Sequence, residues 1–289
     1  MVKYNIYHAD SFDWLSEKKA KSVHGIVTDP PYGIKEYDFD QIEKRESGNG
    51  GVWRLPQEFD GNKRSPSPRF TILNEADHER ISEFHSDLAP LLRKVLVPGG
   101  HVIIASNNLL SYHVINAFLT AGFELRGQIV RTVKTLRGGD RPKGAHKEYA
   151  EVSVIPRAGW EPWLIFRKRC EGRVKDNLKK WYTGALRRPS INNPFWDIIK
   201  SRPANRDERK IAPHPSLKPQ AFIRQIVRAV LPLGKGVVLD PFMGSGSTIA
   251  AAEYLNLKSI GIEVRDEYFE LAEASIPLLS TYESNGSEL

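Results

Sequence analysis

The segment 236–248, GVVLDPFMGSGST, constrains the fold of this 289-residue chain more than any other part of its sequence. Its apolar run predicts a buried strand, its glycines predict a turn, and the residues after them predict the start of a helix. Gly244 and Gly246 allow the backbone to approach a ligand closely, and the helix N-terminus offers unpaired N–H groups. A tight turn without a ligand would explain the same two glycines. The segment therefore predicts an α/β sheet and makes the turn a candidate binding site.

An acidic residue follows this turn at the spacing of a nucleotide-cofactor site. Glu263 ends the next predicted strand, 259–262, and lies 23 residues after Asp240. At a strand tip its carboxylate could accept hydrogen bonds from both hydroxyls of a ribose. The turn lacks the Gly-Lys-Ser/Thr ending of a phosphate-binding loop, which argues against a nucleoside triphosphate.

Strands and helices alternate along most of the chain, which predicts a single α/β core. Two stretches depart from this alternation: 36–75, which we interpret as a long, partly mobile loop, and a turn-rich insertion at 134–157. Strands are predicted at 4–7, 25–28, 101–105, 123–133, 163–166, 236–239 and 259–262, and helices between the first two strands and at 76–96, 108–120, 219–231 and 248–255.

The surplus of positive charge is concentrated in the segment 134–210. This segment contains 20 Lys and Arg against 9 Asp and Glu, whereas the rest of the chain contains 22 against 26. Phosphate neutralisation by such residues supplies most of the sequence-independent affinity for DNA, so the segment indicates a DNA-contacting region. A solvated basic face is the alternative. Trp181, Phe195 and Trp196 could fill the gap left by an extruded base, although packing within a small module is the interpretation we favour.

The composition argues against several classes of protein. Cys170 is the only cysteine, so neither a disulfide framework nor a cysteine-based metal cluster is expected. No apolar run is long enough to cross a membrane, and residues 1–10 do not resemble a signal peptide. We therefore expect a cytoplasmic protein with no bound metal and no membrane partner.

The tetrapeptide Asp29-Pro30-Pro31-Tyr32 follows the predicted strand 25–28 directly, where ligands bind in open α/β sheets. The prolines restrict the backbone and hold two acceptors, the Asp29 carboxylate and the Pro30 carbonyl, in set directions. An aromatic amine such as adenine N6 offers two N–H donors to such a pair, and Tyr32 could stack on an extruded base. A proline-rich turn with a buried tyrosine is the structural alternative.

Together these motifs resemble the beta class of amino-group DNA methyltransferases, in which a DPPY motif precedes the target-recognition region and an FxGxG cofactor motif. Residues 29–32 match the first motif, and 242–246, FMGSG, match the second. The residues HADSF at 8–12 resemble the element whose acid binds the cofactor adenine. The residues HPSLKP at 214–219 resemble the family's HPTQKP, with Ser216 and Leu217 in place of Thr and Gln. In the family this element lies against the methionine end of the cofactor.

The resemblance implies S-adenosylmethionine as cofactor and a circularly permuted, Rossmann-like methyltransferase fold with a small target-recognition insertion. Residues 1–133 would form the catalytic half, 134–210 the recognition region and 211–280 the cofactor-binding half. The residues that it implies for catalysis are Asp29, Pro30, Pro31 and Tyr32, and those for the cofactor are Asp10, Ser11, Phe12, His214, Ser216, Lys218, Asp240, Phe242, Gly244, Ser245, Gly246, Ser247, Thr248 and Glu263.

The function that we predict is methylation of adenine N6 in double-stranded DNA by base flipping and direct in-line attack. Among amino targets, DPPY favours adenine, whereas Ser-Pro-Pro-Tyr is the usual cytosine-N4 form. Methylation of cytosine C5 needs a thiol in a Pro-Cys context, and Cys170 follows Arg169. Cytosine N4, RNA or protein glutamine as target, and a non-catalytic DNA-binding protein, remain alternatives. A homodimer and a restriction-modification partner, the endonuclease, are expectations from the resemblance alone.

Overall fold

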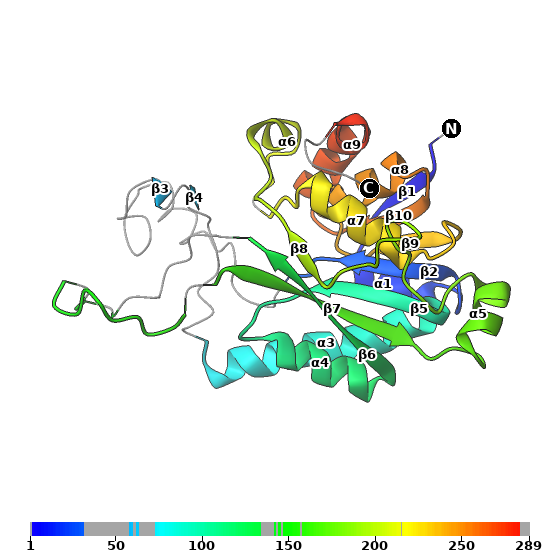
Figure 1. Cartoon of the computed structure of the whole chain (residues 1–289), viewed down its shortest axis with the longest axis horizontal. Helices are drawn as coiled ribbons and strands as arrows, with labels where there is room; N and C mark the ends of the chain where they lie inside the picture. Colours follow the sequence, from blue (N-terminus) through cyan, green and yellow to red (C-terminus); the bar gives the residue numbers. More distant parts are fainter. Residues whose placement is uncertain are drawn as a thin grey trace.

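The computed structural model describes residues 2–31, 58–59, 62–63, 73–133, 142, 144–145, 147–156, 158–214 and 216–283 (Figure 1). Most of the predicted loop 36–75, and most of 134–143, lie outside the described residues. Within the loop only the short antiparallel strands β3 (Glu58–Phe59) and β4 (Asn62–Lys63), and residues 73–75 at the start of a helix, are described.

One eight-stranded sheet organises the described chain, in the order β1-β10-β9-β2-β5-β7-β6-β8. The five strands from β1 to β5 in this order are parallel, β7 runs antiparallel to β5 and β6, and β8 is parallel to β6. The strands are β1 (Tyr4–His8), β2 (Val23–Thr28), β5 (Leu96–Ala105), β6 (Phe123–Thr132), β7 (Trp160–Lys168), β8 (Ile198–Lys200), β9 (Val237–Asp240) and β10 (Lys258–Glu263).

The strand before the glycine-rich turn lies at the centre of this sheet although it comes late in the chain. β9 pairs with β2 through Gly25↔Val238 and Ile26↔Leu239, and with β10 on its other side. The predicted circular permutation is therefore confirmed: the strand before Asp29 and the strand before the turn are direct neighbours. Their carboxyl ends share one edge of the sheet, which we call the carboxyl edge; the opposite edge is the amino edge.

Helices cover both faces of the sheet (Figure 1). The strands are therefore buried on both sides, and along β5 successive residues enter different cores: Val102 and Ile104 pack with α3 and α4, and Ile103 packs with α7. One face carries α1 (Ser11–Glu17), α3 (Glu75–Val95) and α4 (Ser111–Thr120), and the other carries α7 (Gln220–Val230), α8 (Ser247–Tyr254) and α9 (Asp266–Thr281).

The predicted strands and helices are confirmed, with small shifts at their ends. The helix predicted at 76–96 ends at Val95, and β5 already begins at Leu96 and includes Pro98-Gly99-Gly100. α9 was not predicted. The stretch 167–210 has no consistent apolar period, yet it contains α5 (Val174–Trp181), β8 and α6 (Arg206–Ile211). No described helix is both long and apolar enough to cross a membrane.

Buried hydrogen bonds of one side chain hold α5 in place. Asn177 is fully buried, and its Nδ2 donates to the Pro98 carbonyl at 3.0 Å and to the Thr183 carbonyl at 2.8 Å. Its Oδ1 accepts from the Glu171 N–H at 3.0 Å. α5 is therefore attached to the start of β5, at the amino edge of the sheet.

Replacing Asn177 with Ala should lower the free energy of unfolding by about 2 to 4 kcal/mol, because it removes the donor to the buried Thr183 carbonyl and the acceptor of the Glu171 N–H. Urea unfolding of the purified protein measures this change. Lys175→Ala, on the exposed side of the same helix, is the matched control and should change stability by less than about 0.5 kcal/mol. Equal effects of the two substitutions would contradict this account of α5.

Candidate functional site

The first two residues of the tetrapeptide lie beside the glycine-rich turn. Thr28, the last residue of β2, donates from Oγ1 to Oδ1 of Asp240, the last residue of β9, at 2.7 Å. Asp29 follows immediately and retains 19% exposure of its side chain, enough to meet a substrate. Pro30 is buried and Pro31 is exposed. Tyr32 lies outside the described residues, so its stacking role stays a prediction.

Lys218 is the direct partner of Asp29. Its Nζ donates to Asp29 Oδ2, and it lies 3.9 Å from Oε1 of Glu161. Burial alone would lower the pKa of Lys218, but the two carboxylates outweigh burial and raise it above its usual value. The lysine is therefore an ammonium ion that links the tetrapeptide to β7.

Glu161 and Arg131, neither of which was predicted as a site residue, extend this series of charges into the sheet. They face each other on β7 and β6 and form a buried ion pair, with Arg131 Nη1 3.0 Å from Glu161 Oε2. Trp163 Nε1 donates to Glu161 Oε1 at 2.8 Å, and Arg131 Nε donates to Ser201 Oγ at 3.0 Å. A signal for Glu161 existed: it is the one acid in the apolar run WEPWLIF.

Asp240 is a buried carboxyl group at the tip of β9. Burial raises its pKa to about 6, and the charge of Asp29 adds to this, against hydrogen bonds from Thr248, Thr28 and the Phe242 N–H that lower it. The two acids therefore have different surroundings: Asp29 faces an ammonium group, and Asp240 faces hydroxyl and amide donors.

Glu263 and the glycine-rich turn form one unit at the carboxyl edge. Glu263 is buried, with Oε2 accepting from the Gly244 N–H at 3.0 Å and Oε1 accepting from the Val264 and Arg265 N–H groups at 3.0 and 2.9 Å. Gly244 has φ +52°, and a Cβ there would lie 3.3 Å from Nε2 of His214. The glycine thus keeps open a concave backbone between an acid and an imidazole.

The predicted residues on the 8–12 and 214–219 segments also converge on this edge. Ser11 Oγ donates to the Pro241 carbonyl, and the Ser216 N–H donates to His214 Nδ1 at 3.2 Å. Burial, followed by Lys218 and Arg265, lowers the pKa of His214 to about 4, so its ring is neutral at pH 7. Asp10 caps α1, where Oδ1 accepts from the N–H groups of Phe12 and Asp13 at 2.8 and 3.1 Å.

Three partly buried phenylalanines form an apolar wall beside these polar groups. The ring of Phe84, on α3, lies 5.4 Å from that of Phe12 and 5.8 Å from that of Phe242. Phe12 and Phe242 were predicted, whereas Phe84 was not, because its helical spacing is equally typical of a core residue. This wall is of the kind on which a purine packs.

The remaining predicted residues begin α8. Gly246 is its N-cap with φ +82°, and a Cβ there would lie 2.4 Å from Ile276. The backbone carbonyl of Ser245 accepts a hydrogen bond from Ser275 Oγ at 2.8 Å, and that of Ser247 accepts one from Gln220 Nε2 at 3.0 Å. Apart from Tyr32, every predicted site residue is therefore placed at the carboxyl edge, and Lys218 lies against Asp29.

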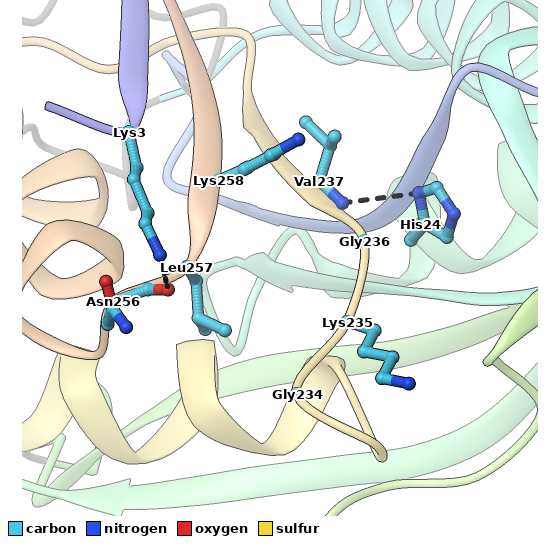
Figure 2. A pocket seen from close by; sticks show the side chains of 9 residues that line it. All are labelled: Lys3, His24, Gly234, Lys235, Gly236, Val237, Asn256, Leu257 and Lys258. Atoms are coloured by element: carbon cyan, nitrogen blue, oxygen red, sulfur yellow. Dashed lines mark hydrogen bonds between the residues drawn. The ribbon is translucent and has the colours of Figure 1, made fainter. Parts of the chain in front are cut away.

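A hollow of about 380 Å³ lies elsewhere, at the amino ends of β9 and β10 (Figure 2). His24 and the lysines Lys3, Lys235 and Lys258 contribute to its lining. Because it is on the opposite edge of the sheet from Asp29 and Gly244, it is not part of the candidate site.

Comparison with known proteins decides the family. A family model described as DNA methylase, that of the N6/N4 methyltransferases, matches residues 23–274. The chain belongs to this family. It is thus a DNA methyltransferase that uses S-adenosylmethionine.

Relatives and solved structures agree with the family assignment. The chain is 26% identical to the Type II methyltransferase M.HindIII of Haemophilus influenzae, over 92% of this chain and 93% of that protein. Its fold is similar to that of a putative DNA modification methylase from Thermus thermophilus, solved with S-adenosyl-L-methionine (TM-score 0.59, 19% identity, 96% and 95% covered). The PvuII DNA methyltransferase, described as cytosine-N4-specific, has a TM-score of 0.60 at 15% identity, with 99% and 89% covered.

The residues at the carboxyl edge fit S-adenosylmethionine. Gly244 forms a concave backbone that a Cβ would narrow, Glu263 supplies a buried carboxylate at a strand tip, and Phe12 and Phe242 supply apolar surface. An adenosine moiety needs these three kinds of surface: an acceptor for its hydroxyls, an apolar wall for its ring and a close backbone.

The shifted pKa of Asp240 predicts a pH-dependent difference in stability. The folded pKa of about 6 lies above the ordinary 3.8, so protonated Asp240 favours folding, and this contribution is lost as the pH rises through about 6. Asp240→Asn removes the ionisation. Relative to the wild type, the variant should be more stable at pH 8 than at pH 4, by up to about 3 kcal/mol. Urea unfolding of both proteins at both pH values measures this, and a difference that does not change with pH would contradict it.

Proposed function

We propose that this chain transfers the methyl group of S-adenosylmethionine to adenine N6 in double-stranded DNA, with Asp29 and Pro30 as acceptors for the target amine. The observation that carries the proposal is the position of Asp29: it directly follows the strand that pairs with β9, so it stands beside the turn that begins at Asp240. An amine held at Asp29 would lie next to a cofactor held at Gly244 and Glu263.

The residues that we propose to bind the cofactor lie at the same edge of the sheet. Glu263 would accept hydrogen bonds from the ribose, Phe12 and Phe242 would contact the adenine ring, and the 214–219 segment would face the methionine end. When bound, S-adenosylmethionine supplies an electrophilic methyl group on a sulfonium. The chain's own residues must then bring a nucleophilic nitrogen to it.

Asp29 and Pro30 would supply the two hydrogen-bond acceptors that make the nitrogen of an aromatic amine nucleophilic. The lone pair of such a nitrogen is delocalised into the ring, and two acceptors that bind its N–H groups direct it away from the ring plane. The nitrogen gains a methyl group and loses a proton, and the Asp29 carboxylate is a base placed to accept that proton. Its partial exposure leaves room for the base to be bound there.

In this proposal Lys218 occupies the position of the target amine until the base binds. Its ammonium N–H occupies Asp29 before the base arrives, and Glu161, 3.9 Å away, is a second carboxylate to which it can turn. Because Arg131 pairs with Glu161, that carboxylate is held in place by the sheet. The charge on Lys218 thus remains compensated when the amine replaces it at Asp29.

Cytosine N4 is the alternative target, because the PvuII methyltransferase of similar fold is described as cytosine-N4-specific. The aspartate at position 29 favours adenine, since a cytosine-N4 enzyme of the class that this chain resembles usually carries serine there. The two products are distinct nucleosides, so the target base is open to direct measurement.

Recognition of the DNA would use the part of the basic segment that lies at the carboxyl edge. β6 ends there and β7 begins there, so residues 133 and 158–159, at the two ends of the connection between them, lie at this edge, and β8 leads from Trp196 to the same edge. Trp196 is 65% exposed, as a residue that meets a partner would be. A cognate restriction endonuclease belongs to the same proposal, because M.HindIII is named a Type II methyltransferase; a homodimer stays an expectation.

Asp29→Ala should abolish methyl transfer while leaving cofactor binding intact. Removal of one preorganised group at a reacting centre lowers kcat by about 100-fold to 1,000-fold, and here the group is also the base. Transfer of labelled methyl groups to duplex DNA measures activity, and calorimetry with S-adenosylhomocysteine measures binding. Activity within tenfold of the wild type would refute the role given to Asp29.

Gly244→Ala should weaken cofactor binding by at least about tenfold, because alanine is strained in the left-handed backbone conformation of this position and its Cβ would lie against His214. Gly172→Ala is the matched control, since Gly172 also has a positive φ, +75°, but has nothing within 4 Å of its Cβ position. Calorimetric titration with S-adenosylhomocysteine compares the two. Equal loss in both variants would point to backbone strain alone and not to the cofactor cradle.

A further inference from the structure

The amino edge of the sheet carries its own concentration of cations, on the side away from Asp29 and Gly244. Part of the basic segment 134–210 lies here, because α5 is attached to the start of β5 through Asn177. Figure 1 shows α5 at this edge, beside the beginnings of β2 and β5. β2 and β5 contain six and ten residues, which at about 3.3 Å per residue separates the two edges by roughly 20 to 30 Å.

Lysines on α5 are arranged with their charges close together. Lys175 and Lys179 are exposed and four residues apart, so they are neighbours on one face of the helix, where like charges repel. Lys180 and Lys21 both contact the single carboxylate of Glu171, at 2.7 and 3.1 Å. An arrangement with more cations than anions on a short helix favours an external anion as partner.

The cations also contribute to the pKa shifts of two nearby groups. Hydrogen bonds from Lys180, Trp181 and Lys21 lower the pKa of Glu171 to about 2 although this carboxylate is exposed. Burial, followed by Arg93 and Lys21, lowers the pKa of Lys168 at the end of β7.

The hollow in Figure 2 lies at the same edge of the sheet, at the amino ends of β9 and β10. Its lining contains Lys3, Lys235, Lys258 and His24 and no acidic side chain among the described residues. Lys235 Nζ lies 5.4 Å from the ring centre of Tyr182, the residue that caps the C-terminus of α5. The hollow and α5 are thus parts of one cationic surface.

We define the amino-edge surface by Lys21, Lys175, Lys179, Lys180, Lys235 and Lys258. We propose that it binds the phosphate backbone of a second DNA duplex segment, without reading its sequence, while the carboxyl edge holds the segment to be methylated. The separation of the edges is what makes the second segment distinct from the first. The inference rests on the proposed function only for the edge at which the substrate segment binds.

Sequence-independent DNA binding relies on several cationic side chains along one surface, which contact the phosphates of the backbone. Such a contact would keep the enzyme on a DNA molecule after it releases one target, because the second segment stays bound. Tyr182 is 40% exposed and adds an aromatic surface next to Lys235.

A bridging experiment tests the proposal. A short duplex is immobilised, the protein is loaded on it, and retention of a second, labelled duplex is measured per molecule of loaded protein. The test variant is Lys175→Glu with Lys179→Glu. The control is Arg80→Glu, a charge reversal of an exposed arginine on α3 that lies outside both the basic segment and the amino-edge surface.

Wild type and control should retain the second duplex, and the test variant should retain at least about tenfold less at moderate salt. The salt dependence of retention should fall by about one unit of log–log slope per lysine removed. Lys235→Gln with Lys258→Gln, on other elements of the same surface, should also reduce retention, so a failure of the first variant to fold leaves the test intact.

Three outcomes would overturn the proposal. They are no retention by the wild type, equal retention by test and control variants, and loss of loading on the immobilised duplex in the test variant. None of these readouts requires methyl transfer, so they are separate from a failure of the proposed function, which Asp29→Ala would reveal.

Discussion

The site depends on the pairing of β2 with β9 at the centre of the sheet. This contact joins two strands separated by about two hundred residues of chain, and it brings Asp29 next to the turn from Asp240 to Gly246. The Thr28 to Asp240 hydrogen bond closes the junction. Burial of both strands by helices on each face makes a shift of register costly. Ile26 and Leu239 pack in one core and Val27 and Val238 pack in the other, so a one-residue shift would place side chains in the core they do not fit.

A second constraint is the series of charges from Asp29 through Lys218 and Glu161 to Arg131. Buried charges are tolerated when each is paired, and here each group has an opposite charge beside it. The series also connects the tetrapeptide to β6 and β7, whose carboxyl and amino ends, respectively, lie at the edge where DNA would be read. A change in that region could therefore reach Asp29 through Glu161, without any contact between the DNA and the lysine.

Sequence alone predicted the parts of this account that local patterns encode. The strands before Asp29 and Asp240, the glycines of the turn and the acid at Glu263 were all visible, since strand tips, positive-φ glycines and spacing leave a local signature. The contact between Lys218 and Asp29 was not visible, because it depends on how distant segments pack. α5 and α6 were missed because they are short: α5 has only Val174, Leu178 and Trp181 at helical spacing, and side-chain hydrogen bonds of Asn177 and Asn205 hold or cap the two helices.

The central claim is that an exocyclic amine held at Asp29 receives the methyl group. It is tested most directly by incubating duplex DNA with the purified protein and S-adenosylmethionine carrying a deuterated methyl group, then identifying the labelled nucleoside by mass spectrometry after digestion. The account predicts deuterated N6-methyldeoxyadenosine. A methyl group on carbon, as in 5-methyldeoxycytidine, or label absent from the bases would contradict it.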